Sequence, residues 1–139
     1  MRSMRVRDLM QHPVVTLDES AEIDLADGLM RMDRIRHLPV VSGGRLVGIV
    51  SQRDLFRAGV ENSLGRGEEA ARSAGLRLQD VMNREVVTAH PDADLASAVE
   101  MLLQRRIGCL PVVEDGRLLG LLSETDCLRH LASLLEAAP

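Results

Sequence analysis

The sequence predicts an α+β fold of two tandem β-α-β-β-α repeats, and three observations support this prediction. A shift of 72 positions aligns Val6–Asp54 with Leu78–Asp126 without a gap, and 19 of the 49 aligned residues are identical. Short β-branched segments alternate with amphipathic segments in both copies. The hydrophobic fraction of 45% is almost entirely aliphatic, with one Phe and no Trp or Tyr, and it suffices for a folded core. A gapless period of this length indicates two copies of one folding unit, which we expect to pack face to face.

Each copy opens with a short helical turn and a strand. The turns contain DLM at Asp8–Met10 and DVM at Asp80–Met82. The VVT segments at Val14–Thr16 and Val86–Thr88 are short and β-branched, so they are predicted as strands. The same two elements are therefore expected at the same place in both copies.

An amphipathic helix is predicted next in each copy. Ser20 and Asp92 occupy matching positions and are good N-cap residues. Apolar residues then recur at helical spacing: Ile23, Ala26, Leu29 and Met30 in the first copy, and Leu95, Ala98, Met101 and Leu102 in the second. Both helices should end before Pro39 and Pro111, because the residue preceding a proline disfavours helical backbone.

A hairpin and a second helix complete each copy. The LPVV segments at Leu38–Val41 and Leu110–Val113 are predicted as buried strands. SGGR and EDGR form the turns, since their glycines adopt positive φ readily, and LVGIV and LLGLL form the return strands. The next helix is expected to begin at Ser51 and at Ser123.

These two helix starts are also candidate binding elements. Asp54 and Asp126 follow Ser51 and Ser123 by three residues, which is the spacing of a capping box. A carboxylate can also accept hydrogen bonds from both hydroxyls of a ribose, and a hydroxyl with free N–H groups at a helix start suits phosphate. The two interpretations are compatible, because one residue can cap the helix when empty and bind when filled.

The repeat gives the domain organisation. Residues 1–59 form the first repeat, 60–77 a linker and 78–139 the second repeat. Each repeat alone is a marginal domain, which favours a shared interface. The linker is rich in Gly, Ser and charge, and a helical turn is expected at Glu68–Arg72.

Composition and motifs limit the functional classes. The net charge of -4 and the dispersed arginines disfavour nucleic acid as a partner. No stretch is apolar enough to span a membrane, and no secretory signal is seen, so a cytoplasmic protein with reduced cysteines is expected. No nucleophile, metalloprotease or P-loop motif is present, so an enzyme is not expected.

The last helix carries an apolar stripe at helical spacing. Its members are Leu128, Leu131, Leu134 and Leu135. The stripe is either part of the intramolecular core or a contact between two copies of the chain, and the sequence leaves both interpretations open.

The series DLM, VVT, LPVV, GRLVGIVS and D, present twice in register, resembles the CBS-domain pair, or Bateman module. The resemblance implies two β-α-β-β-α units packed through their sheets with pseudo-two-fold symmetry. It implies clefts that bind adenosine-containing regulatory ligands, namely AMP, ADP, ATP or S-adenosylmethionine, with no required cofactor and no metal. It further implies a homodimer that signals to a regulated protein and is not itself catalytic.

The resemblance assigns residues to two clefts, each combining the Ser and Asp of one copy with the first strand and pre-LPVV residues of the other. Cleft A contains Val15, Ile35, Arg36, His37, Ser123, Thr125 and Asp126. Cleft B contains Ser51, Arg53, Asp54, Val87, Ile107, Gly108 and Cys109. Valine and isoleucine would flank the adenine, while the Ser and Asp residues would contact the ribose and phosphate.

The two clefts differ in positive charge. Arg36 and His37 of cleft A correspond to Gly108 and Cys109 of cleft B, where Arg53 is the nearest cation. Because guanidinium offers several donors to phosphate, cleft A is expected to hold the more phosphate-rich ligand and cleft B to bind more weakly or stay empty. A solvated loop end is the competing interpretation of Arg36 and His37.

Two other functions stay open at this point. The chain could be a ligand-free scaffold for dimerisation or docking, in which the Ser and Asp residues act only as caps. It could also be a redox or metal sensor through Cys109 and Cys127, although their spacing is unlike a structural zinc site.

Overall fold

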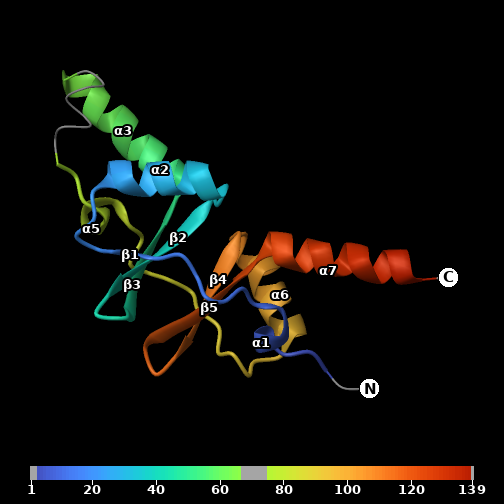
Figure 1. The fold of residues 1–139 in the computed structure, drawn as a ribbon. Helices are drawn as coiled ribbons and strands as arrows, with labels where there is room; N and C mark the ends of the chain where they lie inside the picture. Colours follow the sequence, from blue (N-terminus) through green and yellow to red (C-terminus); the bar gives the residue numbers. More distant parts are fainter. Residues whose placement is uncertain (1–2, 67–74, 139) are drawn as a thin grey trace. The chain divides into compact units, whose positions relative to one another are not determined.

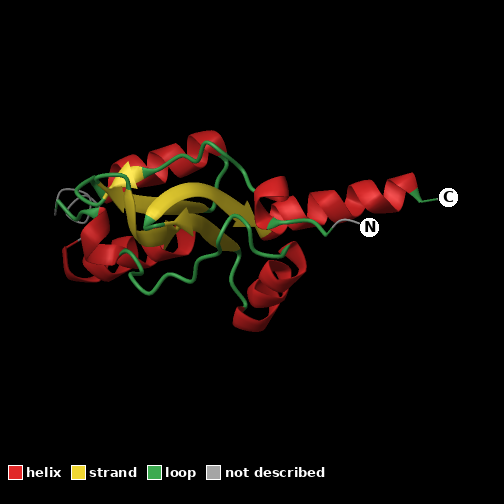
Figure 2. Cartoon of the chain, turned by 90° about the horizontal axis from the view of Figure 1, so that it is seen from below, coloured by secondary structure: helices red, strands yellow, loops and turns green. Residues whose placement is uncertain are grey.

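A computed structural model describes residues 3–66 and 75–138, the side chains of 60–66 excepted, and divides the chain into two compact units. The central unit is Val15–Val86, and the split unit combines Met1–Val14 with Val87–Pro139. Both contain helices and strands (Figures 1 and 2), which confirms the predicted α+β class. No helix in the described ranges is long and apolar enough to cross a membrane.

The central unit is built around an antiparallel hairpin. Its elements are β1 (Leu17–Asp18), α2 (Ile23–Asp33), β2 (His37–Ser42), β3 (Arg45–Ser51), α3 (Gln52–Arg66) and α5 (Leu78–Val81). β2 pairs antiparallel with β3, and β1 pairs parallel with β2. The order strand, helix, strand, strand, helix is the one predicted for a copy.

The split unit repeats this arrangement. Its elements are α1 (Val6–Leu9), α6 (Leu95–Arg105), β4 (Cys109–Glu114), β5 (Arg117–Ser123) and α7 (Glu124–Ala137). β4 and β5 form the antiparallel hairpin. Both hairpins turn through two residues of positive φ, Gly43–Gly44 and Asp115–Gly116, as type I′ connections require. Aspartate tolerates this conformation, which explains how EDGR replaces SGGR.

Each unit has its own hydrophobic core. In the central unit, α2 and the hairpin contribute fully buried residues, among them Met30, Leu38 and Val50 at 0% exposure. In the split unit the equivalent contributions come from α6 and the β4–β5 hairpin, including Leu110 and Leu122 at 0%. The apolar residues predicted at helical spacing therefore face the sheets.

The leading segments of the two copies are exchanged between the units. α1, from the first copy, packs in the split unit, where Val6 is fully buried. α5, from the second copy, packs in the central unit, where Leu78 is fully buried. The backbone bonds correspond position by position: Val6 N–H donates to Ala93 O and Leu78 N–H donates to Ala21 O, both at 2.9 Å. The compact units therefore differ from the repeats seen in the sequence.

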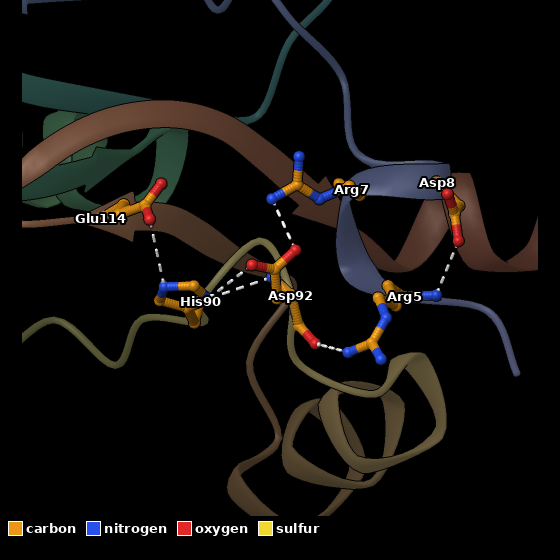
Figure 3. Close-up of polar contacts among 6 residues, drawn as sticks. All are labelled: Arg5, Arg7, Asp8, His90, Asp92 and Glu114. Carbon is orange, nitrogen blue, oxygen red and sulfur yellow. Dashed lines mark hydrogen bonds and ion pairs between the residues drawn. The ribbon is translucent and has the colours of Figure 1, made fainter.

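Polar side chains anchor α1 in the split unit (Figure 3). The Arg5 guanidinium donates to the Asp92 carbonyl, and the Arg7 guanidinium pairs with the Asp92 carboxylate. His90 Nδ1 accepts from the Asp92 N–H at 3.0 Å, and its Nε2 lies 3.6 Å from Glu114 Oε1. These contacts hold the turn before α6 against the leading segment.

The central unit reproduces part of this anchor. Arg77, the counterpart of Arg5, donates its guanidinium to the Ser20 carbonyl. The Arg77 N–H donates to Asp80 Oδ2 at 2.9 Å, as the Arg5 N–H does to Asp8 Oδ2 at 2.8 Å. The exchange is thus supported by the same chemistry in both units.

Glycine allows the leading segments to approach the hairpins closely. A Cβ on Gly48 would lie 2.6 Å from Met82 Sδ, and a Cβ on Gly120 would lie 2.6 Å from Met10 Sδ. Met10 of the DLM motif therefore packs directly on the backbone of β5, and Met82 of the DVM motif packs on the backbone of β3. This contact explains why both return strands have a glycine at the same position.

The first strand of each copy is shorter than predicted and begins later. The VVT segments are not strands: β1 is Leu17–Asp18, and in the second copy only Ala89 forms a bridge, to Val112. The ladder cannot extend back to VVT, because Pro39 and Pro111 have no N–H to donate on this side of β2 and β4.

The predicted N-caps of α2 and α6 are also wrong. The helices begin after Glu22 and Asp94, and neither side chain caps. The first helical N–H groups, of Ile23 and Leu95, instead donate to backbone carbonyls of the exchanged leading segments, at 3.1 and 2.9 Å. Ser20 bonds to Asp18 and lies in the turn before α2.

The segment expected as a linker, 60–77, is partly helical. α3 continues through Arg66, and α5 begins at Leu78. Residues 60–64 contain no Gly or Pro, so nothing ends the helix there. The helical turn expected at Glu68–Arg72 lies outside the described residues.

Candidate functional site

The Ser and Asp residues at the starts of α3 and α7 form capping boxes, as predicted. The Ser51 N–H donates to Asp54 Oδ2 at 2.9 Å, and the Asp54 N–H donates to Ser51 Oγ at 3.1 Å. The Ser123 N–H donates to Asp126 Oδ2 at 3.0 Å, and the Asp126 N–H donates to Ser123 Oγ at 3.1 Å. Each carboxylate is thereby fixed at the positive end of a long helix.

The first strand of each hairpin begins beside the helix start of its own copy. His37 is in register with Ser51, and Cys109 is in register with Ser123. The Gln52 N–H donates to the carbonyl of Arg36 at 3.0 Å, and in the second copy Glu124 donates likewise to Gly108 at 2.9 Å. The pre-LPVV residues are therefore tied to the first turns of α3 and α7.

These contacts reduce the number of backbone donors available to an anion. Of the first three N–H groups of α3, those of Gln52 and Asp54 are already bonded, and α7 shows the same pattern. Within the described residues, no hydrogen bond occupies the N–H of Arg53 or Thr125. One backbone donor per helix is thus left to meet a phosphate, together with any side-chain cation.

The predicted cleft residues are distributed over both units. In cleft A, Val15, Ile35, Arg36 and His37 belong to the central unit, and Ser123, Thr125 and Asp126 to the split unit. In cleft B, Ser51, Arg53 and Asp54 belong to the central unit, and Val87, Ile107, Gly108 and Cys109 to the split unit. The structure joins Arg36 and His37 to Ser51 of their own copy, and the grouping of residues across copies stays a prediction.

Exposure separates these residues into accessible and buried groups. Arg36, Arg53 and Thr125 are exposed, so their side chains are available to a charged ligand. Asp126 is only 8% exposed, and Cys109 is 5% exposed. The Cys109 side chain is therefore part of the buried core, so its backbone is the part best placed to meet a ligand.

The sequence interpretation missed a contact of Asp126. Gln11, in the segment after α1, donates from Nε2 to Asp126 Oδ1 at 2.6 Å. The two residues are 115 positions apart. No local pattern links them, because the contact exists only through the exchange of leading segments.

Both cysteines are held as neutral thiols. Burial raises the pKa of Cys109 to about 12, with a contribution from the Glu124 carboxylate. Burial, and then the Asp126 carboxylate, also raise the pKa of Cys127. A raised thiol pKa lowers the thiolate fraction that reacts or binds metal, which argues against the redox-sensor interpretation. Among residues 3–66 and 75–138, no cluster of three His, Cys, Asp or Glu side chains could hold a metal ion.

Comparison with known proteins identifies the family. The family model for the CBS domain matches residues 6–61 and again residues 78–133. The chain therefore belongs to the CBS domain family and carries two tandem CBS domains, as the motif series predicts.

Known relatives contain this pair alone or within larger proteins. Homoserine O-acetyltransferase of Methanococcoides burtonii is 35% identical over 126 residues, which cover 89% of this chain and 23% of the enzyme. The chain thus spans about a quarter of the length of this curated relative. AcuB of Vibrio cholerae, a protein assigned to acetoin utilization, is 33% identical with a TM-score of 0.85, and the match covers 99% of this chain and 100% of AcuB.

Two similar solved structures contain adenosine compounds. The CBS domain pair of protein MJ0100, in complex with 5′-methylthioadenosine and S-adenosyl-L-methionine, is 25% identical with a TM-score of 0.79, covering 96% of this chain and 99% of that one. CBSX2, in complex with AMP, is 27% identical with a TM-score of 0.79, covering 94% and 98%.

Proposed function

We propose that this chain is a regulatory module that binds an adenosine-containing ligand: AMP, ADP, ATP or S-adenosylmethionine. The observation that carries the proposal is the repeated Ser–Asp pair at the starts of α3 and α7. A carboxylate fixed at a helix start can accept two hydroxyl hydrogens of a ribose, and the adjacent helix end favours phosphate. The complexes of MJ0100 and CBSX2 with adenosine compounds support this ligand class.

The residues assigned above to clefts A and B are the proposed ligand contacts. Asp54 and Asp126 would bind ribose hydroxyls, and the exposed Arg36 and Arg53 would meet phosphate. Ligand binding would favour one arrangement of the two copies, or of two modules in a homodimer, by the difference in its affinity for each arrangement. A regulated protein would respond to that change.

Ligand binding is tested by calorimetry and thermal melting with AMP, ADP, ATP and S-adenosylmethionine. A ligand at about 100 times its Kd should stabilise the protein by roughly 2.7 kcal/mol. Asp54→Asn and Asp126→Asn each remove one charge while keeping a side chain of the same size, so each should weaken binding about tenfold or more. With no Trp or Tyr in the chain, absorbance at 260 nm also reveals co-purified nucleotide.

Asp80→Asn is the matched control for these variants. Asp80 accepts from the Arg77 N–H at the start of α5, in the same local geometry, but no cleft residue contacts it through a hydrogen bond in the described chain. Asp80→Asn should therefore lower stability slightly and leave ligand affinity unchanged. Absence of binding by any of the four compounds at millimolar concentration would contradict the proposed function.

A docking scaffold is the second candidate, and one observation favours it. The leucine stripe of α7 is exposed, with Leu128 at 63%, Leu131 at 49%, Leu134 at 55% and Leu135 at 66%. The stripe is therefore not part of the core of this chain. An exposed apolar helix face of this kind fits a second copy of the chain.

A further inference from the structure

The two helix-start carboxylates are not equally free to bind a ligand. Asp126 accepts three hydrogen bonds: Oδ2 from the Ser123 N–H and from Ser123 Oγ, at 3.0 and 2.7 Å, and Oδ1 from Gln11 Nε2 at 2.6 Å. Asp54 accepts the equivalent bond from the Ser51 N–H through Oδ2. In the part of the chain that the structure describes, no hydrogen bond reaches Asp54 Oδ1.

The backbone does not cause this difference. Gln11 exchanges two hydrogen bonds with Leu121, at 2.9 and 3.0 Å, and Asn83 exchanges the same two with Ile49 at the same distances. Gln11 and Asn83 are separated by the repeat distance of 72 positions. The Gln11 and Asn83 side chains therefore start from equivalent positions beside β5 and β3.

The cause lies in the side chains and in the residues that follow them. Asn83 Oδ1 accepts a hydrogen bond from the Glu85 N–H at 3.1 Å, which turns the amide back onto its own backbone. The residue in the place of Glu85 in the first copy is Pro13, which has no N–H to offer. Gln11 is also one methylene longer, so its amide extends to Asp126 instead.

We propose that Gln11 is a specificity-determining residue that competes with ribose hydroxyls for Asp126. The inference rests on the proposed adenosine-binding function. A carboxylate has about four acceptor positions, and three bonds already occupy Asp126, so a diol that donates two bonds must displace one of the present donors. The Gln11 amide is the donor that does not belong to Ser123, the capping residue of α7. Asp54 keeps Oδ1 open. For the ribose part of the ligand, this difference between the two carboxylates reverses the expectation that cleft A, which contains Asp126, binds more strongly than cleft B.

Calorimetry with AMP and 2′-deoxy-AMP tests the competition one carboxylate at a time. Asp54→Asn leaves Asp126 as the helix-start carboxylate available to the ribose. In this background, Gln11→Met removes the amide while keeping the length of the side chain. We expect AMP affinity to rise about tenfold, the worth of one hydrogen bond to a charged group. The preference for AMP over 2′-deoxy-AMP should rise with it, because the freed oxygen accepts the 2′-hydroxyl.

Asn83→Ala in the Asp126→Asn background is the matched control. The Asn83 amide does not contact Asp54, so AMP affinity and the preference over 2′-deoxy-AMP should stay the same. Gln11→Ala provides a second variant, and circular dichroism verifies that each variant is folded.

The outcomes separate the two proposals. Unchanged or weaker AMP binding in both Gln11 variants, with binding retained by the Asp54→Asn parent, overturns the competition and leaves the proposed function standing. No binding of AMP, 2′-deoxy-AMP, ADP, ATP or S-adenosylmethionine by the wild type or any variant overturns both.

Discussion

Gly120→Ala should destabilise the protein by forcing the leading segment away from β5. The new Cβ would lie 2.6 Å from Met10 Sδ and 2.8 Å from the Gln11 carbonyl oxygen. Met10 can rotate, because its side chain is long and flexible. The Gln11 carbonyl cannot move so easily, since that residue exchanges two backbone hydrogen bonds with Leu121.

The magnitude follows from these contacts. Overpacking in a filled interior costs about 1–3 kcal/mol, and each strained backbone hydrogen bond adds up to about 1 kcal/mol. Replacing a strand glycine with alanine recovers roughly 0.5–1 kcal/mol of conformational entropy. The net loss should be about 2 kcal/mol, which lowers Tm by roughly 6–8 °C in a chain of this length.

Urea and thermal melts followed by circular dichroism measure this loss, because the chain has no Trp or Tyr fluorescence. Gly48→Ala should cost less, since the atoms nearest its Cβ belong to the mobile Met82 side chain and the Asn83 carbonyl is 3.1 Å away. Gly28→Ala in α2, where a Cβ has nothing within 4 Å, should be neutral or stabilising. If Gly120→Ala melts like Gly28→Ala, or Gly48→Ala is the more damaging of the two strand variants, the close-approach argument is wrong.

Three further predictions follow from the described contacts. Between pH 8 and pH 10 the free energy of unfolding should fall by about 1.4 kcal/mol, because Cys109, with its pKa raised from 9.0 to about 12, stays protonated when folded but ionises when unfolded. This contribution to stability is thus present below pH 9 and is lost as the pH rises toward 12. Cys109→Ala should flatten the dependence of the unfolding free energy on pH in urea melts. An unchanged pH dependence would contradict the assignment of this effect to Cys109. Ser123→Ala removes the hydroxyl that accepts from the Asp126 N–H and should cost about 1 kcal/mol of unfolding free energy. Ser123→Thr keeps a hydroxyl and should retain most of this stability in the same melts. Equal stability of the wild type and both variants would show that the cap contributes nothing. Leu131→Glu places a charge in the exposed stripe of α7 and should shift a homodimer toward monomer in sedimentation velocity, while an unaltered distribution would exclude this face from a dimer contact.

Local patterns in the sequence predicted most elements of the fold. The apolar spacing located α2 and α6, the glycine-containing turns located both hairpins, and the Ser–Asp spacing located the starts of α3 and α7. These features depend on neighbours within a few residues, which the sequence displays directly. The two capping boxes were predictable for the same reason.

Contacts between distant segments were not predictable from those patterns. Val6 and Leu78 satisfy the same local pattern, and the two cores are nearly alike, so no local signal decides which core receives which segment. The absent side-chain caps of α2 and α6 follow from backbone contacts with distant segments that replace the expected local ones. The first strand is short because its partner strand contains a proline with no N–H to donate. The bond from Gln11 to Asp126 likewise exists only because the leading segments are exchanged.

The exchange of leading segments means that the repeating unit of the sequence is not the stretch of chain that folds as one body. A fragment cut at the repeat boundary would keep its own hairpin but lose the helix that completes that hairpin's core, such as Leu78 for the first copy. Val15–Val86 is the contiguous fragment that retains a complete core. Two identical single-repeat chains could complete each other by trading first helices, so the present chain is the covalently joined equivalent of a domain-swapped dimer.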